Sequence, residues 1–535
     1  YYGPLLAVVR MPFVLLGHGI DGRFTRLSTT VAFAAACTAT FHLGRNLAPH
    51  SRSHRRVPML VVAVAVSPLL ALAGWSSVYH ETELWAFVGF VATIALLASL
   101  RHQPTTRTAA IAGLSALATV LVRASVGYGA VAAVVITAAL LWRDGRRPVA
   151  IRALVPAVIG FVLNIGINVA KFGTLVDLPA SKQVLTLHDP RRAAGFAGNG
   201  GSFFGTRFIP TTLVQYLRPD GVRLERLVPF VRFGPLAHQF GNYPLEGNTP
   251  ASSLTTSASL LSVAAVIGIV LVVRRRQWHV APWMFGAMVA ALPTFMIGFV
   301  ANRYLTDLLP LLVIPAAVAF TAWQVRRVQL ARTGMVALSV WGVWCNVSLA
   351  VWTSELKNPT FTSLRYHLDD AVFGGAAPSV VSVAPGVPAP RDGIVGIDGM
   401  CDGLYIAEQG KWVALERADG VRRAHGTLDT VAGNVFTSPS GSLELVAAAD
   451  GVRARWAPVD GASVDGTAVR SSPLAKLDIS SDPVAGGLTV SIDGHLSLYA
   501  FAAPPLTDAT WSAEFEPVTT RDRGTPICTF LQDRR

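Results

Sequence analysis

One short stretch of the chain holds a histidine and two carboxylates, in the order Trp75-Ser-Ser-Val-Tyr-His80-Glu81-Thr-Glu83-Leu-Trp85. A carboxylate can remove the proton from an attacking hydroxyl group, and a histidine can act as a second acid or base. Apolar residues flank the stretch, and acids this close to hydrocarbon are costly unless they are paired, solvated or in functional use. We therefore predict His80, Glu81 and Glu83 as catalytic residues. The simpler alternative is an outer loop in which both acids face water and the two tryptophans are interfacial aromatics.

The same three side chains could also hold a metal ion, because imidazole and carboxylate groups are common ligands of divalent cations. The sequence offers no further ligand that must converge on them. A divalent cation stays an open alternative, and no other cofactor is indicated.

Three cations stand at the ends of apolar stretches, and they suit a phosphate group. They are Arg123, Lys171 and Arg303. A guanidinium offers five donors in a fixed geometry that matches phosphate oxygens. We predict that these cations, with Tyr304, bind the phosphate of a lipid-linked donor. Two alternatives remain: Arg303 pairs with Asp307 one helical turn away, or the cations only reach lipid headgroups.

Two amides, Asn164 and Asn168, are four residues apart in an apolar stretch and so share one helix face. Amides in such positions commonly join neighbouring helices. That structural role is favoured, and substrate binding by Asn168 is the alternative.

The composition indicates the elements that must position these residues. The chain has 535 residues, of which 52% are hydrophobic and 14% charged, whereas soluble chains are about 25% charged. A helix that crosses a membrane needs about 20 mainly apolar residues. Ten stretches qualify, and we predict one helix for each: 27–43, 57–74, 85–100, 108–122, 128–142, 153–170, 254–273, 280–300, 304–323 and 333–352. The apolar segment 1–13 contains two prolines, and we expect it to lie in the outer interface.

The distribution of the net charge of +13 along the chain indicates how the predicted helices are oriented in the membrane. Five short loops on one side of the predicted bundle carry sixteen arginines and one acid, Asp144. Short cytoplasmic loops are rich in Lys and Arg, so these loops are predicted to lie inside. Nucleic-acid binding is not expected, because the charge is divided among five loops instead of forming one stripe. The nucleotide-binding, zinc-protease and CxxC motifs are absent.

The chain divides into a membrane domain and a smaller second domain. We assign residues 1–353 to an α-helical polytopic bundle with a long outer loop, 171–253, which could act as a lid. A connector and linker, 354–390, follow. Residues 391–535 alternate short apolar stretches with Gly and Asp turns, and we predict an extracytoplasmic all-β sandwich. Cys401 and Cys528 bracket it and could form a disulfide, while Cys37 and Cys345 fall within spans and act as small apolar residues.

Several motifs together resemble those of the GT-C-type polytopic membrane glycosyltransferases, particularly actinobacterial members with a β-rich tail. The motifs are Tyr-Tyr-Gly-Pro at 1–4, Tyr-His-Glu-Thr-Glu-Leu-Trp at 79–85, Leu-Val-Arg-Ala-Ser-Val-Gly at 121–127, Asn-Val-Ala-Lys-Phe-Gly at 168–173 and Asn-Arg-Tyr-Leu-Thr-Asp-Leu-Leu-Pro at 302–310. The resemblance covers roughly residues 1–352.

The resemblance implies an enzyme of the cell membrane that moves a hexose or pentose from a polyprenyl phosphate to a cell-wall glycan or lipid acceptor on the outer face. His80, Glu81 and Glu83 match the family's second acidic loop, and Arg303 matches an arginine that contacts phosphate. The family's principal Asp follows its first span, and we expect both to precede Tyr1, so that this chain is N-terminally truncated. The tail resembles a jelly-roll carbohydrate-binding module.

The reaction that this implies needs its acids and arginines in one place. We therefore expect Glu81, Glu83 and Arg303 to line a single cleft at the outer rim of the bundle. Two other functions stay open. A transporter or flippase of a lipid-linked sugar would need charges inside its spans, and few are evident. A membrane-anchored glycan-binding protein would use only the tail.

Overall fold

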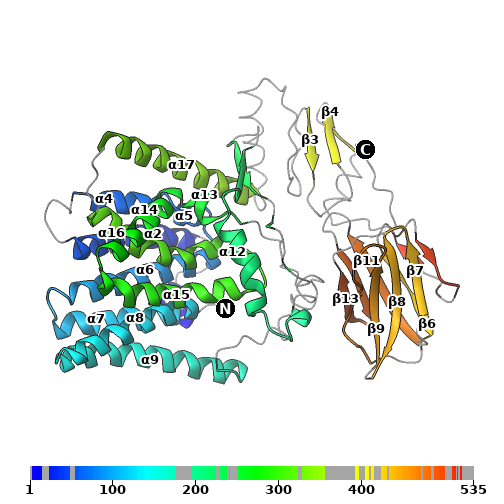
Figure 1. Ribbon diagram of the computed structural model, residues 1–535, viewed down its shortest axis with the longest axis horizontal. Coiled ribbons are helices and arrows are strands. Elements are labelled where there is room, and N and C mark those ends of the chain that lie inside the picture. The colour runs from blue at the N-terminus through cyan, green and yellow to red at the C-terminus, as the bar shows by residue number, and fades with distance from the viewer. Residues whose placement is uncertain are drawn as a thin grey trace.

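The computed structural model consists of a helical part and a part made of antiparallel sheets (Figure 1). It describes residues 3–14, 23–48, 55–175, 196–224, 229–234, 236–237, 240, 251–322, 328–355, 392–396, 404–408, 411–414, 423–429, 433–449, 451–470, 474–482, 487–500, 506, 509–513, 515 and 518–520. The predicted linker and both Cys401 and Cys528 lie outside the described residues.

Helices account for most of the described residues in each of the ten apolar stretches, although 57–74 and 254–273 are each divided into two helices and 297–300 is not helical. The helices of the first half are α1 (Pro4–Val14), α2 (Arg23–Leu47), α4 (Val57–Ala65), α5 (Pro68–Gly74), α6 (Val78–Ser99), α7 (Thr106–Val122), α8 (Ala124–Arg143) and α9 (Arg147–Phe172). Those of the second half are α12 (Ile209–Leu217), α13 (Leu254–Ser257), α14 (Ser259–Arg274), α15 (Ala281–Met296), α16 (Leu305–Ala322) and α17 (Val328–Glu355), with 3-10 turns η3 (Thr206–Phe208), η4 (Trp278–Val280) and η5 (Asn302–Tyr304).

Seven of these helices, some with an adjoining 3-10 turn, are long and apolar enough to cross a membrane. They include residues of α2, α6, α8, α9, α15, α16 and α17. The pair α4 and α5 passes the same test together but is bent by 53°. The helices α7 and α14 are apolar and shorter. The described chain is therefore consistent with a multi-pass membrane protein, and α1, with 11 residues, is too short to cross.

The start of α6 corrects one prediction. The stretch 75–84 was expected to be a loop, but α6 begins at Val78 and carries His80, Glu81 and Glu83 in its first two turns. Ser77 explains the early start: its side chain accepts a hydrogen bond from the backbone N–H of His80 at 3.2 Å, as helix N-caps do. The two acids are therefore helical and buried, each 1% exposed, and the wet-loop alternative is wrong.

The junction between α7 and α8 has no loop. Arg123 alone separates the two helices, in an extended conformation with φ −152° and ψ 108°. Its side chain is thus set at the end of the bundle where both helices meet. On the other side of α8, Gly129 meets Gly286 of α15, where a Cβ atom would lie 2.3 Å from the Gly286 carbonyl oxygen. Small residues at such contacts allow membrane helices to approach closely.

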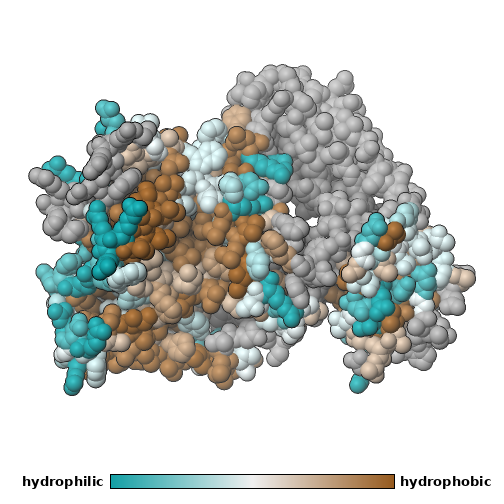
Figure 2. All heavy atoms as spheres, in the orientation of Figure 1, coloured by the Kyte–Doolittle hydropathy of each residue, from teal (hydrophilic) through white to brown (hydrophobic). Residues whose placement is uncertain are grey.

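The arginine-bearing loops lie at the opposite end of these helices. Arg101 lies between α6 and α7, Arg107 lies in the first turn of α7, Arg146 lies between α8 and α9, and all three are exposed. Figure 2 shows brown atoms over much of the helical part and teal atoms gathered at its left end. The described helices therefore separate an arginine-rich end from the end that holds Glu83 and Arg123.

The described residues between 196 and 240 cover part of that second end. The helix α12 and the hairpin of β1 (Val222–Leu224) and β2 (Val231–Phe233) belong to it. The ring of Phe233 packs edge-to-face on Trp352 of α17, with centroids 5.4 Å apart. Within the predicted outer loop, the described pieces are thus packed onto the bundle.

The described residues of the second part contain antiparallel strands, in agreement with the β-rich pattern of 391–535. The strands are β3 (Asp392–Gly396), β4 (Leu404–Glu408), β5 (Lys411–Ala414), β6 (Arg423–Asp429), β7 (Gly433–Ser438), β8 (Gly441–Ala448), β9 (Gly451–Pro458), β10 (Val464–Asp465), β11 (Leu474–Asp482), β12 (Gly487–Ile492), β13 (His495–Ala500), β14 (Thr510–Trp511) and β15 (Val518–Thr520).

Two sheets of five strands share one apolar core. Their orders are β10-β9-β8-β7-β14 and β13-β12-β11-β6-β15. Leu443 and Trp456 of the first sheet and Leu477 and Val490 of the second belong to the same buried cluster. Alternate residues of each strand point into that core, as the alternating burial of β8 and β9 shows. The strands β3, β4 and β5 form a separate sheet of three.

Candidate functional site

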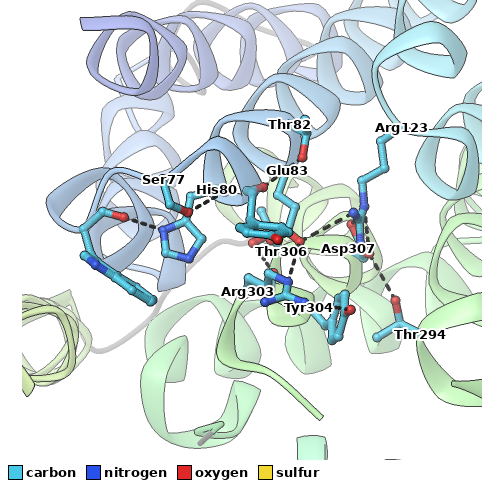
Figure 3. A network of polar contacts seen from close by, with 12 residues as sticks. Ser77, His80, Thr82, Glu83, Arg123, Thr294, Arg303, Tyr304, Thr306 and Asp307 are labelled. Atoms are coloured by element: carbon cyan, nitrogen blue, oxygen red, sulfur yellow. Dashed lines mark hydrogen bonds and ion pairs between the residues drawn. The ribbon is translucent and has the colours of Figure 1, made fainter. Parts of the chain in front are cut away.

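Charged side chains from four elements of the bundle meet at one end of it (Figure 3). Glu83 comes from the second turn of α6, Arg123 from the α7–α8 junction, Arg303 from η5 and Asp307 from the first turn of α16. We call these four residues the charged cluster. The two acids are each 1% exposed, so the cluster lies inside the helical packing.

The tightest contact of the charged cluster joins Arg123 to Asp307. The Nε of Arg123 donates to Oδ1 of Asp307 at 2.8 Å, and Nη2 donates to Oδ2 at 2.5 Å. Thr294 of α15 donates a further hydrogen bond to Oδ2, at 3.2 Å. Burial alone would lower the pKa of Arg123, but Asp307 and Glu83 outweigh it and raise the pKa above the usual range. Arg123 is therefore a permanent cation.

Arg303 lies between two aromatic rings. Its guanidinium carbon is 5.2 Å from the centre of the Tyr79 ring and 4.8 Å from that of Tyr304, distances at which cation–π attraction operates. Its Nη2 donates to the Tyr304 hydroxyl at 3.1 Å. The side chain is 23% exposed. The alternative that Arg303 pairs with Asp307 is not what the structure has, because Asp307 binds Arg123.

Glu83 contacts both arginines through one oxygen. Its Oε1 lies 3.5 Å from Arg123 Nη1 and 3.5 Å from Arg303 Nε. Its other oxygen, Oε2, is buried and has no hydrogen-bond partner among the described residues. A buried polar atom without a partner is rare and costly. Glu83 thus carries one buried acceptor atom that has no hydrogen-bond partner among the described residues and can take up a proton.

Glu81 faces a different set of neighbours. Positions two apart on a helix point to nearly opposite sides, and Glu81 forms an ion pair with Arg10 of α1. Ser28 of α2 donates to Glu81 Oε1 at 2.6 Å. Ser28 in turn accepts from the indole N–H of Trp85 at 3.0 Å. Glu81 therefore binds α1 and α2 to α6.

A cavity of about 480 Å³ adjoins this second group. Its wall comes from α1, α2, α6 and α7 and is mostly apolar, with Arg10, Ser28 and Glu81 among its polar members. Ligand pockets of about 300 to 1,000 Å³ with a few polar groups are typical of small-molecule sites. Glu83 and Arg303 do not line this cavity. The expectation of one cleft shared by Glu81, Glu83 and Arg303 is therefore wrong.

His80 lies near both groups but contacts neither acid in the described interactions. Its Nδ1 meets the carbonyl oxygen of Trp75. Its ring packs on the Trp75 indole with centroids 4.5 Å apart. His80, Glu81 and Glu83 consequently do not converge as metal ligands. Within the described residues, no three His, Cys, Asp or Glu side chains form a group that could hold a metal ion.

The remaining predicted residues lie along α9. Lys171 is exposed near its C-terminal end, and the described contacts of the charged cluster do not include it. Asn168 is 6% exposed and donates to the carbonyl oxygen of Leu175 at 3.2 Å. Asn164 accepts a hydrogen bond from the Tyr128 hydroxyl of α8 at 2.7 Å. Asn164 thus joins two helices.

Sequence reasoning missed two members of these groups. Asp307 was considered only as a local partner of Arg303, although an acid inside an apolar span is itself a signal of a buried pair. Arg10 was overlooked inside the apolar segment 1–13. A single charged residue in such a segment could have indicated a buried acidic partner.

Among the described residues, the charged cluster and the cavity lie at the same end of the bundle. Comparisons with protein-family models, with curated proteins and with solved structures found no match for this chain.

Proposed function

We propose that the protein transfers a sugar from a polyprenyl phosphate to a glycan or lipid acceptor outside the cell membrane. The observation that carries this proposal is the apolar cavity beside α6, at the same end of the bundle as the charged cluster. A lipid-linked sugar phosphate has a long hydrocarbon chain and a charged head. It needs an apolar cavity for the chain and cations for the phosphate. The prenyl chain lies in the cavity, and the phosphate lies within reach of the arginines.

The head of the donor has to pass over the N-terminal end of α6. Glu81 and Glu83 lie on opposite sides of one helix, whose diameter with side chains is about 10 Å. The cavity therefore holds the chain on the Glu81 side, and the sugar reaches the Glu83 side. Arg303 fits the phosphate best, because it is part-exposed and makes weaker contacts with carboxylates than Arg123 does.

The chemistry requires one base and one stabilised leaving group. The acceptor hydroxyl oxygen forms a bond to the anomeric carbon, and its proton passes to Glu83 Oε2. The bond between that carbon and the phosphate oxygen breaks, and the electron pair leaves with the phosphate. Positioned cations that face developing negative charge lower such barriers, and Arg303 supplies one.

The topology of this proposal has ten crossings. The bent pair α4 and α5 counts as one crossing, and α7 and α14 as two more. The arginine-bearing loops lie inside, following the positive-inside rule. The strands after residue 391 then lie outside the membrane and form a β-sandwich of jelly-roll type. In that position they bind the glycan acceptor.

A transfer assay tests the proposal. The full chain in lipid nanodiscs is incubated with polyprenyl phosphates carrying radiolabelled pentose or hexose and with cell-envelope glycan. Label in the glycan, released polyprenyl phosphate, and loss of both on Glu83→Gln are expected. Label that stays entirely in the donor for every sugar offered would refute the transferase.

The charged cluster also favours one rival, a flippase of the lipid-linked sugar. Few charges were expected inside the spans, but Glu83, Arg123 and Asp307 are buried between helices. Buried ion pairs of this kind occur on the pathways of transporters. Proteoliposomes distinguish the two functions: a flippase moves unchanged donor between leaflets, whereas a transferase makes product without moving it.

A further inference from the structure

Two helices of the bundle are broken, and a third helix touches both breaks. Between α4 and α5 the chain bends by 53° at Val66 and Ser67. Between α13 and α14 it breaks at Ala258, which has φ −126° and ψ 38°. Breaks of this kind free backbone groups that need other partners. Asn346 of α17 supplies a partner to each.

The Asn346 amide donates to both breaks. Its Nδ2 lies 2.8 Å from the carbonyl oxygen of Val66 and 2.7 Å from that of Ser257, as well as 2.9 Å from that of Gly342 in its own helix. The side chain is 0% exposed. Gly342 permits the approach, since a Cβ atom there would lie 2.8 Å from the Val66 carbonyl oxygen.

The break at Ser257 leads to Arg303. The hydroxyl of Ser257 lies 3.1 Å from that of Ser252, which is 2.7 Å from Oδ1 of Asn302. The backbone N–H of Ser252 donates to the same oxygen, at 3.2 Å. Asn302 directly precedes Arg303 in η5. A continuous set of polar contacts thus runs from Asn346 to the start of η5.

The break at Val66 leads to Glu83. Ser67 caps α5, a helix of only seven residues, which cannot hold its position without packing. Only Trp75, Ser76 and Ser77 separate α5 from α6. The position of α5 therefore sets the position of the first turns of α6, where Glu83 lies.

We propose that Asn346 is a positioning residue, which fixes the two broken helices relative to each other so that Glu83 and Arg303 meet. Its amide hydrogen-bonds both the α4–α5 break and the α13–α14 break, and these two segments lead to Glu83 and to Arg303, respectively. The catalytic consequence rests on the transferase proposed above, whereas the structural coupling does not.

Hydrogen exchange followed by mass spectrometry tests the coupling without any reaction. The variant Asn346→Leu keeps nearly the same volume and loses the donors. Asn164→Leu is the matched control, because Asn164 is also an amide that is 0% exposed and joins two helices. We expect faster exchange in both 75–83 and 251–258 for Asn346→Leu, and in neither for Asn164→Leu. Unchanged exchange in both segments, or faster exchange in one segment only, would refute the proposal that Asn346 couples the two broken helices.

Two further measurements keep the inference testable. If Asn346→Leu does not fold, Asn346→Ser leaves one donor and a smaller side chain, and the same paired response is expected. In the transfer assay, Asn346→Leu should lower kcat about tenfold and raise donor KM less than Arg303→Ala does, because a displaced Arg303 still reaches the phosphate whereas misplaced reacting groups lower the rate. Partial recovery by Asn346→Gln, which keeps the amide, supports the positioning role, and equal loss in Leu and Gln variants overturns it. Absence of transfer in the unaltered chain refutes the transferase and leaves the exchange result standing.

Discussion

Arg123 and Asp307 form a bidentate ion pair between residues that are 184 positions apart. The pair joins the α7–α8 junction to the first turn of α16. Because both side chains are largely buried, removing one leaves the other as an uncompensated charge, whereas removing both does not.

Stability should therefore respond differently to single and double substitutions at this pair. We expect Arg123→Leu or Asp307→Leu to cost about 3 to 5 kcal/mol each, and the double variant to recover much of that loss. Thermal unfolding of the purified protein in detergent measures the effect. Single variants that unfold at the temperature of the unaltered chain would show that the pair contributes little.

The two acids of α6 should have separable roles. Glu83→Gln removes the proposed base, and transfer should fall by about 100-fold or more while the donor still binds. Glu81→Gln removes the charge partner of Arg10, so α1 should loosen and donor affinity should fall, with the rate of bound donor largely retained. Single-turnover kinetics with prebound donor separates the two. Equal rate losses in both variants would argue against the division of roles.

Arg303 should matter for the donor more than for folding. Its replacement by Ala removes a charge-assisted contact to phosphate, which is worth about 1.5 to 3 kcal/mol, or about 10- to 100-fold in affinity. Arg143→Ala is the control, since it removes an exposed arginine at the arginine-rich end of the bundle. Titration with donor, alongside thermal unfolding, gives both quantities. Unchanged affinity for Arg303→Ala would exclude the phosphate role.

The cavity should be specific for the chain of the donor. Ala118 lines it, and Ala118→Phe should fill part of the space and weaken binding of long-chain donors. Donors with a very short chain should bind as before. Leu114→Phe on the same helix is the control, because Leu114 is 53% exposed and outside the cavity. The same loss for both chain lengths would place the prenyl chain elsewhere.

The ten-crossing topology predicts opposite accessibility for two exposed positions. Ala462→Cys, near β10, should react with a membrane-impermeant maleimide in intact cells. Gln103→Cys, between α6 and α7, should react only after the membrane is permeabilised. The unaltered chain, with its own cysteines, gives the background. Labelling of both positions in intact cells would contradict the topology.

The sequence was sufficient for the long apolar helices and for the β-rich character of the second part, but not for most of its individual strands. Long apolar stretches and arginine-bearing turns leave few alternatives for α2, α8 or α9. It did not predict that α6 begins before its apolar stretch. Two acids at 81 and 83 are typical of a solvated loop, and the arginines that pair with them in the fold cannot be identified from the sequence.

The candidate site was predictable only in part. Alternating spans place Glu83, Arg123 and Arg303 at one end of the bundle, and the structure brings these three together. Sequence spacing suggested that Arg303 pairs with Asp307, but the fold brings Arg123 to Asp307 from a position 184 residues away, and the sequence spacing does not show that contact. Which face of α6 each acid occupies depends on where the helix starts, so Glu81 and Glu83 were wrongly expected in one cleft.

The formal charges of the cluster sum to zero, since Glu83 and Asp307 offset Arg123 and Arg303. Binding of a phosphate group to this neutral cluster would give the occupied site a net negative charge, and the cluster is largely buried from water. Proton uptake would restore neutrality, and Glu83 Oε2 is the described atom placed to accept it. During transfer the acceptor hydroxyl supplies that proton, so departure of the phosphate and protonation of the Glu83 carboxyl group would favour each other.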